Sequence, residues 1–246
     1  MNMKIERIES NPIVKLTFEF SLGVIAYCKR LDAQKDFQPL IWAGSTQNAL
    51  VINNDRPIYS VRELIDYAKK NPGKLNYASA GNGSAHHLAG ELFKMQTKTF
   101  LTHIPYRGAG PALADLIAGQ VDMLFDGLGS SSQHIKSGKI KALGMFSGKR
   151  LQGAPEVPTI QEAGGPALES STWVMFLAPA GTPPAVVNRL SQETARVVND
   201  TEIRDRFNAL GIEVAGYTPE QTGKFLADEI AKWAKVIQTA GVKAEQ

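Results

Sequence analysis

Apolar and polar positions follow two different patterns along this chain. Short, mostly apolar runs have the length of buried strands, and they occupy 49–53, 75–78, 99–106, 121–126, 140–147 and the first part of 172–184. In other segments apolar residues recur every three or four positions, as in amphipathic helices, and these begin near residues 61, 85, 111, 182, 201 and 218. Strands separated by such helices predict an α/β architecture with mainly parallel pairing.

Local signals indicate where several helices begin. Ser60 followed by Glu63 has the spacing of a capping box, in which each residue accepts a hydrogen bond from the backbone N–H of the other. Thr159 with Glu162 repeats this pattern. The last helix should begin after Thr218 and carry an apolar stripe, which consists of Leu226, Ile230, Trp233 and Ile237.

Composition and charge narrow the functional classes. The chain has 246 residues, of which 43% are hydrophobic, and this is enough for one large domain or two lobes. Its net charge of +3 is spread over mixed acidic and basic positions, so we expect no nucleic-acid partner. The single cysteine, Cys28, excludes an intrachain disulfide, and the adjacent His86 and His87 would point apart on a helix. We therefore expect no metal site.

The apolar stretch at 13–28 is interrupted by Lys15 and Glu19. A signal-peptide core is normally uninterrupted, and a membrane span needs about 18 apolar residues or more. We expect neither in the chain as written.

The stretch "YASAGNGSAHHLAGELF" (77–93) places small polar residues directly before a helix. The first N–H groups of a helix lack partners and carry partial positive charge, so such a start suits an anion. A carboxylate or phosphate oxygen fits the donors of the loop, which are Ser79, Gly81, Asn82, Gly83 and Ser84. The alternative is an ordinary tight turn with a serine cap, because the loop matches neither a Walker A nor a G-x-G-x-x-G pattern.

Two further strand ends carry polar or glycine residues. Arg107, between Tyr106 and Gly108, could pair with an anionic ligand, or it could be a solvated turn residue. Asp126 could accept from a ligand hydroxyl or ammonium, or it could cap the next helix. Ligands of open α/β sheets bind where such loops meet, so we expect the three loops to converge on one edge.

His87 and His103 fit a role in packing at least as well as a role in ligand binding. His87 lies one turn into the helix that follows the first loop, and His103 lies in an alternating strand. Ser84 and His87 could be described as a dyad, but neighbours on one helix rarely orient a hydroxyl for attack. We therefore expect no catalytic residue, no cofactor and no enzymatic activity.

Several blocks of the sequence together resemble one known family. They are "LNYASAGNGSAHHLAGELFK", "THIPYRGAGPALADLIAGQVDMLFD", "HIKSGKIKALG", "VPTIQEAG", "STWVMFLAPAGTPPAVVNRL" and "IAKWAKVIQTAGVK". Over roughly residues 35 to 243 the chain is similar to the Bug/TctC family of extracytoplasmic solute receptors. The resemblance implies a two-lobed periplasmic binding protein of type II that binds a small carboxylate and delivers it to a tripartite tricarboxylate-type permease of one large and one small membrane subunit.

The resemblance also implies positions. The binding loop of the family's second lobe matches Ser79 to Ser84 with His87, and further elements match Tyr106 to Gly108 and Asp126. Weaker candidates of the first lobe are Ser45, Thr46 and Asn48. The implied domains are an unmatched segment at 1–34, a partial lobe one at 35–53 and 172–246, and lobe two at 54–171.

Family members normally begin with a signal peptide and a first-lobe loop of the type P-P-G-G-x-x-D, and neither occurs here. We expect a family member without this N-terminal part, with an incomplete lobe one. The alternatives are a cytoplasmic ligand sensor and a truncated receptor that no longer functions.

Overall fold

The computed structural model of the chain describes residues 32–209, 211–214 and 216–242. Its strands are β1 (Phe37–Asn53), β2 (Asn76–Ser79), β3 (Thr102–Pro105), β4 (Met123–Gly127), β5 (Ile140–Met145), β6 (Ser171–Pro179) and β7 (Ile212–Val214). Its helices are α2 (Val61–Lys70), α3 (Ala85–Thr97), α4 (Ala109–Ile117), α5 (Leu128–Lys136), α6 (Pro184–Asn199), α7 (Thr201–Ala209) and α8 (Pro219–Ala240). The predicted α/β architecture is confirmed, whereas the segment at 1–31 and Cys28 lie outside the described residues.

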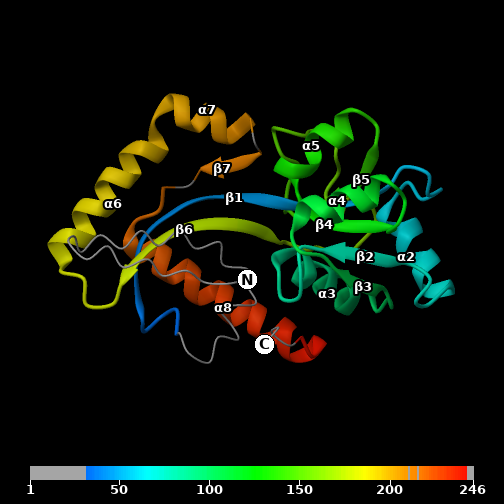
Figure 1. Cartoon of the computed structure of the whole chain (residues 1–246), viewed down its shortest axis with the longest axis horizontal. Helices are drawn as coiled ribbons and strands as arrows, with labels where there is room; N and C mark the ends of the chain where they lie inside the picture. The colour runs from blue at the N-terminus through cyan, green and yellow to red at the C-terminus, as the bar shows by residue number, and fades with distance from the viewer. Residues whose placement is uncertain (1–31, 210, 215, 243–246) are drawn as a thin grey trace.

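The elements form two halves that lie side by side along the long axis of the molecule (Figure 1). One half contains β2 to β5 with α2 to α5, and the other contains β6, β7 and α6 to α8. Strand β1 runs through both. Its residues 37–47 pair with β6, and its residues 48–53 pair with β4 and β5.

The sequence predicted only the second part of β1, at 49–53. A proline at 39 and the polar run at 45–48 break the apolar pattern before it, so pattern alone gave no reason to extend the strand. The first part is nevertheless held on both edges at 44–46, where β6 lies on one side and β7 on the other.

Strand pairing is mixed, which corrects the prediction of mainly parallel pairing. Strand β1 is antiparallel to β4, β5, β6 and β7, whereas among the strands of the described residues the pairs β2–β3 and β2–β4 are parallel. The order along the main path of the sheet is β3-β2-β4-β1-β5. A strand–helix–strand crossover makes successive strands parallel, but β1 enters this sheet from the other half and runs in the opposite direction.

The parallel strands carry three loops to one edge of the sheet. Because β2, β3 and β4 share a direction, the residues after their carboxyl ends meet at the same edge. Figure 1 shows β2 ending on the side that faces the other half. The predicted convergence of the three loops is therefore confirmed, and it occurs next to the place where β1 passes between the halves.

Two apolar clusters cover the two faces of this sheet. Leu50 and Ile52 of β1 join the cluster under α2 and α3, whereas Ala49 and Val51 join the cluster under α4 and α5. All four side chains are fully buried. A strand covered on both faces shows a continuous apolar run instead of an alternation, and this is why 49–53 could be recognised from the sequence.

Helix α8 packs against both halves. Leu226 belongs to the cluster with β6, whereas Trp233 and Ile237 pack with Ala85 and Leu88 of α3. Leu226, Trp233 and Ile237 of the predicted stripe are buried, and Ile230 is partly buried against the cluster of β6. Among the described residues, no helix has the length and apolar character that a membrane crossing requires.

The predicted cap at Ser60 forms, but the box with Glu63 is only half formed, because the Glu63 carboxylate accepts from the N–H of Tyr59 at 2.8 Å instead of that of Ser60. The Oγ of Ser60 accepts from the N–H of Glu63 at 3.1 Å, and Thr218 forms a complete capping box with Gln221. The bonds expected within 159–162 also form, although that segment continues as a turn.

We expect Gly90→Ala to destabilise the fold although alanine favours helices. A Cβ on Gly90 would lie 2.8 Å from Cζ of Tyr77, a buried ring whose hydroxyl is held by Glu91. Overpacking of this kind costs about 1–3 kcal/mol, against a gain in helix propensity of about 1 kcal/mol. Equilibrium urea unfolding measures the difference.

Gly223→Ala is the matched control for this prediction. Gly223 lies in α8, and its added Cβ would contact Cγ of Pro39 at an ordinary 3.4 Å. The control should therefore keep a gain of about 0.5–1 kcal/mol. Equal effects of the two substitutions would contradict the packing assigned to Gly90.

Candidate functional site

The N-terminus of α3 forms one wall of the loop edge. Ser84 is its N-cap, and the Oγ of Ser84 accepts from the N–H of His87 at 3.2 Å. Gly81 and Gly83 have φ values of +125° and +72°, which favour glycine, and they let the loop turn tightly into the helix. The first turn of α3 contains no acidic side chain, so the positive end of its dipole is not offset locally.

Ser79 is engaged inside the protein at the start of this loop. It is fully buried, its Oγ lies 2.6 Å from Nε2 of His103, and it also accepts from the N–H of Gly81 at 3.1 Å. Asn82 lies exposed at the tip of the loop. The loop therefore has an anchored end at Ser79 and an accessible tip.

Stacked histidines support the loop from below. Nδ1 of His87 accepts from the N–H of Gly83 at 3.0 Å, and the His87 ring stacks on His103 with 3.8 Å between centroids. The sequence left open whether His87 packs beneath the loop or touches a ligand. The structure places it beneath the loop, buried and hydrogen-bonded to it.

A buried carboxylate extends this support along α3. Oε1 of Glu91 accepts from the hydroxyl of Tyr77 and from Nζ of Lys94, each at 2.6 Å, and lies 3.7 Å from Nε2 of His87. Glu91 and Lys94 were missed by the sequence analysis. Their spacing of four and seven residues after His87 places them on the same helix face, and this was the available signal.

The surroundings of this cluster shift its ionisation. Burial, with the nearby His87, lowers the pKa of His103 to about 3. Burial alone would raise the pKa of Glu91, but hydrogen bonds from His87, Lys94 and Tyr77 outweigh it and lower the pKa to about 2. At neutral pH the cluster therefore combines an ionised Glu91 with a neutral His103.

The second loop is less buried. The hydroxyl of Tyr106 donates to Oδ2 of Asp115 at 2.7 Å, and burial with this carboxylate raises the pKa of Tyr106 to about 12. Arg107 is exposed and forms no ion pair with any residue in the described ranges. Gly108, with a φ of +116°, is the N-cap of α4.

Asp126 ends β4 and is completely buried. Its Oδ2 accepts from the hydroxyls of Ser130, at 2.6 Å, and Ser131. The helix α5 begins at Gly127 without a side-chain cap, so the alternative in which Asp126 caps that helix through a backbone N–H is not what the structure shows. Its other oxygen, Oδ1, faces Nε2 of His86 at 3.5 Å, beyond the usual range of about 2.7–3.2 Å.

The candidates on β1 have different surroundings. Asn48 donates through Nδ2 to Oγ of Ser170 at 2.9 Å, so it joins β1 to the segment leading into β6. Ser45 is buried where β6 and β7 flank β1. Thr46 lies over the end of β4, because a Cβ on Gly127 would be 3.2 Å from Cγ2 of Thr46.

Three buried polar atoms near the end of β4 have no hydrogen-bond partner in the described part of the chain. They are Oγ1 of Thr46, Nδ1 of His86 and Oδ1 of Asp126. Each comes from a different element, namely β1, α3 and β4. A buried polar group without a partner costs about 1–3 kcal/mol, so such groups require a physical explanation. The sequence analysis considered His86 only as a metal ligand and missed this position.

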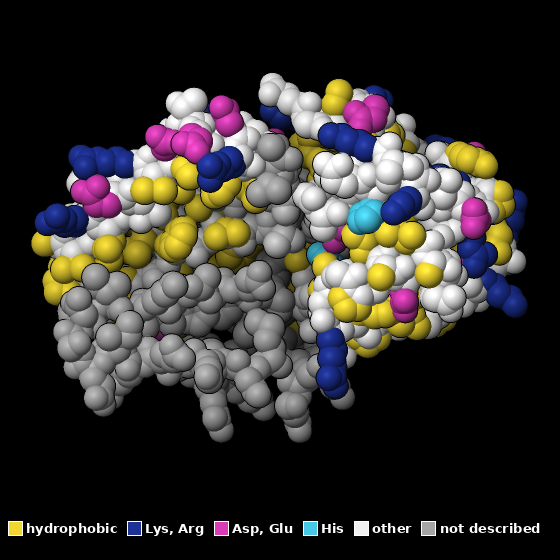
Figure 2. Space-filling model, turned by 45° about the horizontal axis from the view of Figure 1, so that its top comes forward, with side chains coloured by type: hydrophobic (Ala, Val, Ile, Leu, Met, Phe, Trp, Pro, Cys, Tyr) yellow, Lys and Arg dark blue, Asp and Glu magenta, His cyan; other side chains and the backbone are white. Residues whose placement is uncertain are grey.

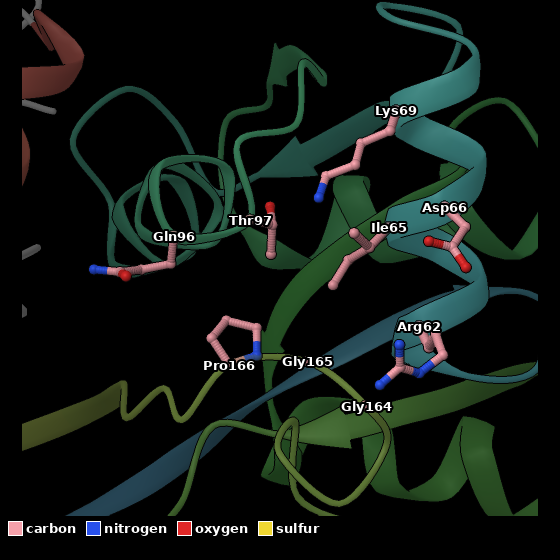
Figure 3. Close-up of a pocket in the computed structure, with 9 residues that line it drawn as sticks. All are labelled: Arg62, Ile65, Asp66, Lys69, Gln96, Thr97, Gly164, Gly165 and Pro166. Atoms are coloured by element: carbon pink, nitrogen blue, oxygen red, sulfur yellow. The ribbon is translucent and has the colours of Figure 1, made fainter.

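A separate pocket of about 240 Å³ lies in the half that contains β2 to β5. It is bounded by α2, by Gln96 and Thr97 at the end of α3 and by the 164–166 loop, and Arg62 and Lys69 point toward it (Figure 3). None of the predicted site residues lines it.

One face of the molecule shows a mixture of side-chain types (Figure 2). Basic, acidic and hydrophobic side chains are interspersed over the coloured part of the face in Figure 2. Among the described residues, no group of three or more His, Cys, Asp or Glu side chains could hold a metal ion.

Comparisons with known sequences identify one family. The model of the tripartite tricarboxylate transporter family receptor (TctC) matches residues 20–242. The UPF0065 protein from the tcbD-tcbE intergenic region of Pseudomonas sp. (strain P51) is 39% identical over 215 residues. The match covers 87% of this chain and 64% of that relative. The chain thus spans about 64% of the length of the curated relatives that it matches most strongly.

Solved structures with the same fold extend the comparison. R. palustris Rpa4515 with adipate is 35% identical with a TM-score of 0.80, over 86% of this chain and 71% of that chain. The periplasmic binding protein BugD is 32% identical with a TM-score of 0.80, over 92% and 76%. MatC from Rhodopseudomonas palustris with bound malate is 29% identical with a TM-score of 0.79, over 88% and 76%.

Acid should destabilise the protein over two overlapping pH ranges, one determined by His103 and the other by Glu91. The imidazole of His103 titrates near 6.5 in the unfolded chain and near 3 in the fold. As the pH falls from 6.5 toward 3, the unfolded state takes up a proton that the folded state does not, so the free energy of unfolding decreases. Glu91 adds its own loss between its ordinary value of 4.5 and about 2.

We expect His103→Gln to reduce the slope of the free energy of unfolding against pH between 6.5 and 5. The reduction should correspond to the loss of up to about one proton taken up on unfolding. Burial also lowers the pKa of His86, which remains in the variant, so some slope should persist. Urea unfolding at successive pH values measures the slope, and His134→Gln removes an imidazole from α5 as the control. An unchanged slope in His103→Gln would contradict the assigned neutral state.

Proposed function

The chain belongs to the tripartite tricarboxylate transporter receptor (TctC) family, and on this basis we propose that it binds a small carboxylate between its two halves. The observation that carries the proposal is the loop edge beside β1. There Thr46 of β1 lies against Gly127 at the end of β4, and α3 packs against α8 of the other half. Two structural relatives bind adipate and malate, which are small carboxylates.

The physical basis for carboxylate binding is the start of α3. The helix dipole favours negative charge at this end, the Ser84 hydroxyl can donate to an anion, and Gly81 and Gly83 allow close approach to the backbone. The N–H of Gly83 is itself held by Nδ1 of His87. We infer that the ligand carboxylate interacts with the tip of the loop at Asn82, Gly83 and Ser84. His87 and Ser79 then serve this site by holding the loop in place.

The other predicted site residues have different roles in this proposal, from ligand contact to structural support. Exposed Arg107, carried by the loop of Tyr106 and Gly108, can reach toward an approaching anion from the rim. Asp126 and Thr46 line the inner end of the loop edge, and Ser45 is the buried neighbour of Thr46 in β1. Asn48 has a structural role at the crossover between the halves.

We propose that residues 35–53 with 172–246 form one lobe and that 54–171 form the other. Strand β1 is shared, because its residues 48–53 pair within the second lobe. Ligand binding would bring the loop edge and the polar part of β1 together by closure about this strand. Helix α8 packs against α3, so closure would have to change or preserve this contact.

Delivery of the ligand to the two membrane subunits of a tripartite tricarboxylate-type permease, and a periplasmic location, follow from the family as further parts of the proposal. The family consists of receptors, so we expect binding without turnover of the ligand.

A thermal-shift panel of mono-, di- and tricarboxylates tests the binding proposal. A ligand that binds only the native state adds about 2.7 kcal/mol of stability at 100 times its Kd. At least one carboxylate should raise the melting temperature in proportion to the logarithm of its concentration. A panel without any such shift would favour the alternative of a truncated receptor that no longer binds.

Ser84→Ala should weaken the binding of the carboxylate found in that panel. Loss of a hydrogen bond to a charged group costs about 1.5–3 kcal/mol, which isothermal titration calorimetry resolves easily. The substitution also removes the cap of α3, at about 1 kcal/mol of stability.

Ser60→Ala separates these two effects. Ser60 caps α2 in the same way, outside the loop edge, and accepts from Glu63 at 3.1 Å. It should lower stability by a similar amount and leave affinity unchanged. Equal affinities of the Ser84 variant and the unmodified protein would remove Ser84 from the site.

A further inference from the structure

Three buried polar atoms, on Thr46, His86 and Asp126, lack a hydrogen-bond partner in the described part of the chain. They bear on which group a ligand would need besides its carboxylate. Oδ1 of Asp126 is fully buried, and its neighbour Oδ2 is already satisfied by Ser130 and Ser131. Nδ1 of His86 is buried on a ring whose Nε2 faces Asp126 at 3.5 Å. Oγ1 of Thr46 is buried on a half-buried residue that lies against Gly127, the residue after Asp126. The unsatisfied side of Asp126 is therefore distinct from the side that holds α5.

We propose that Thr46, His86 and Asp126 form a subsite for a hydrogen-bond-donating substituent, a hydroxyl or an ammonium group, on the carbon chain of the carboxylate ligand. This inference rests on the proposed function, because it names the class of carboxylate that the same site selects. Unsubstituted dicarboxylates lack the group that this subsite requires.

The acceptor character of the subsite carries the assignment. A carboxylate oxygen accepts hydrogen bonds and cannot donate them. A neutral imidazole has one N–H and one acceptor nitrogen, and Nε2 of His86 is the nitrogen that faces the carboxylate. We assign the proton to Nε2, which leaves Nδ1 as an acceptor. Two acceptors and one threonine hydroxyl then await a donor.

The position of the subsite fits a substituent on a ligand held at α3. His86 lies two residues after the cap Ser84, and Asp126 lies at the end of β4, the strand beside β2. Thr46 approaches from β1, where 44–46 belong to the other half. A substituent near the bound carboxylate would therefore contact both halves, and the acceptor oxygens there offer no donor to a second carboxylate.

Matched ligand series test the proposal on the unmodified chain. Isothermal titration calorimetry compares succinate with malate and aspartate, glutarate with 2-hydroxyglutarate and glutamate, and adipate with 2-aminoadipate, with both enantiomers of each chiral acid. In the series whose length fits, we expect the hydroxy or amino acid to bind at least about tenfold more tightly than the unsubstituted parent.

Two substitutions assign the preference to these residues. Asp126→Asn replaces one carboxylate oxygen with an NH2 donor and removes the charge, so we expect it to lower the affinity for the amino acid about tenfold or more relative to its effect on the unsubstituted parent. Thr46→Val keeps the shape of the side chain and should remove part of the preference without disturbing α5. Thr102→Val on β3 and Asp228→Asn on α8 are the matched controls.

The outcomes separate this inference from the proposed function. Equal binding of parents and substituted acids would overturn the subsite while the carboxylate receptor stands. A preference that survives both Asp126→Asn and Thr46→Val would also overturn it, since the substituent would then be read elsewhere. If no member of any series binds, the proposed function itself fails, and the subsite fails with it.

Discussion

Strand β1 must satisfy the hydrogen-bonding and burial requirements of both halves of the molecule. Its first part pairs with β6 and β7, its second part pairs with β4 and β5, and no turn separates the two. The direction and register of both sheets are therefore coupled through one backbone. Because the polar run at 45–48 lies where the strand changes partners, β1 also brings Thr46 to the end of β4.

The loop edge gains its geometry from this arrangement and its rigidity from the buried cluster below. His87 ties Gly83 to α3, His103 ties Ser79 to β3, and Glu91 joins the cluster to Tyr77. A buried polar network is stable only when its members are satisfied, and this one is satisfied by neighbours from β2, β3 and α3. The contrast with Asp126 is informative, because one of its oxygens is equally buried and lacks such a partner.

The family and the site support each other at different levels. Membership of the TctC family rests on a match over residues 20–242, and it fixes the class of protein. It does not fix which substituents a ligand carries, because relatives of similar structure bind adipate, which is unsubstituted, and malate, which bears a hydroxyl. That distinction depends on individual side chains, and here the buried acceptors of His86 and Asp126 provide the physical criterion.

The sequence by itself determined the features that depend on nearby residues. Helix starts at Ser60 and Thr218, the cap at Ser84 and the buried run at 49–53 follow from local hydrogen bonding and from periodicity, which a short window contains. Family membership was also legible, because its blocks are linear. Only the tertiary structure decided the antiparallel course of β1, the approach of Thr46 to Gly127 and the approach of His86 to Asp126. Their relation depends on strand pairing between distant segments, and no local pattern encodes which strand a given backbone will pair with.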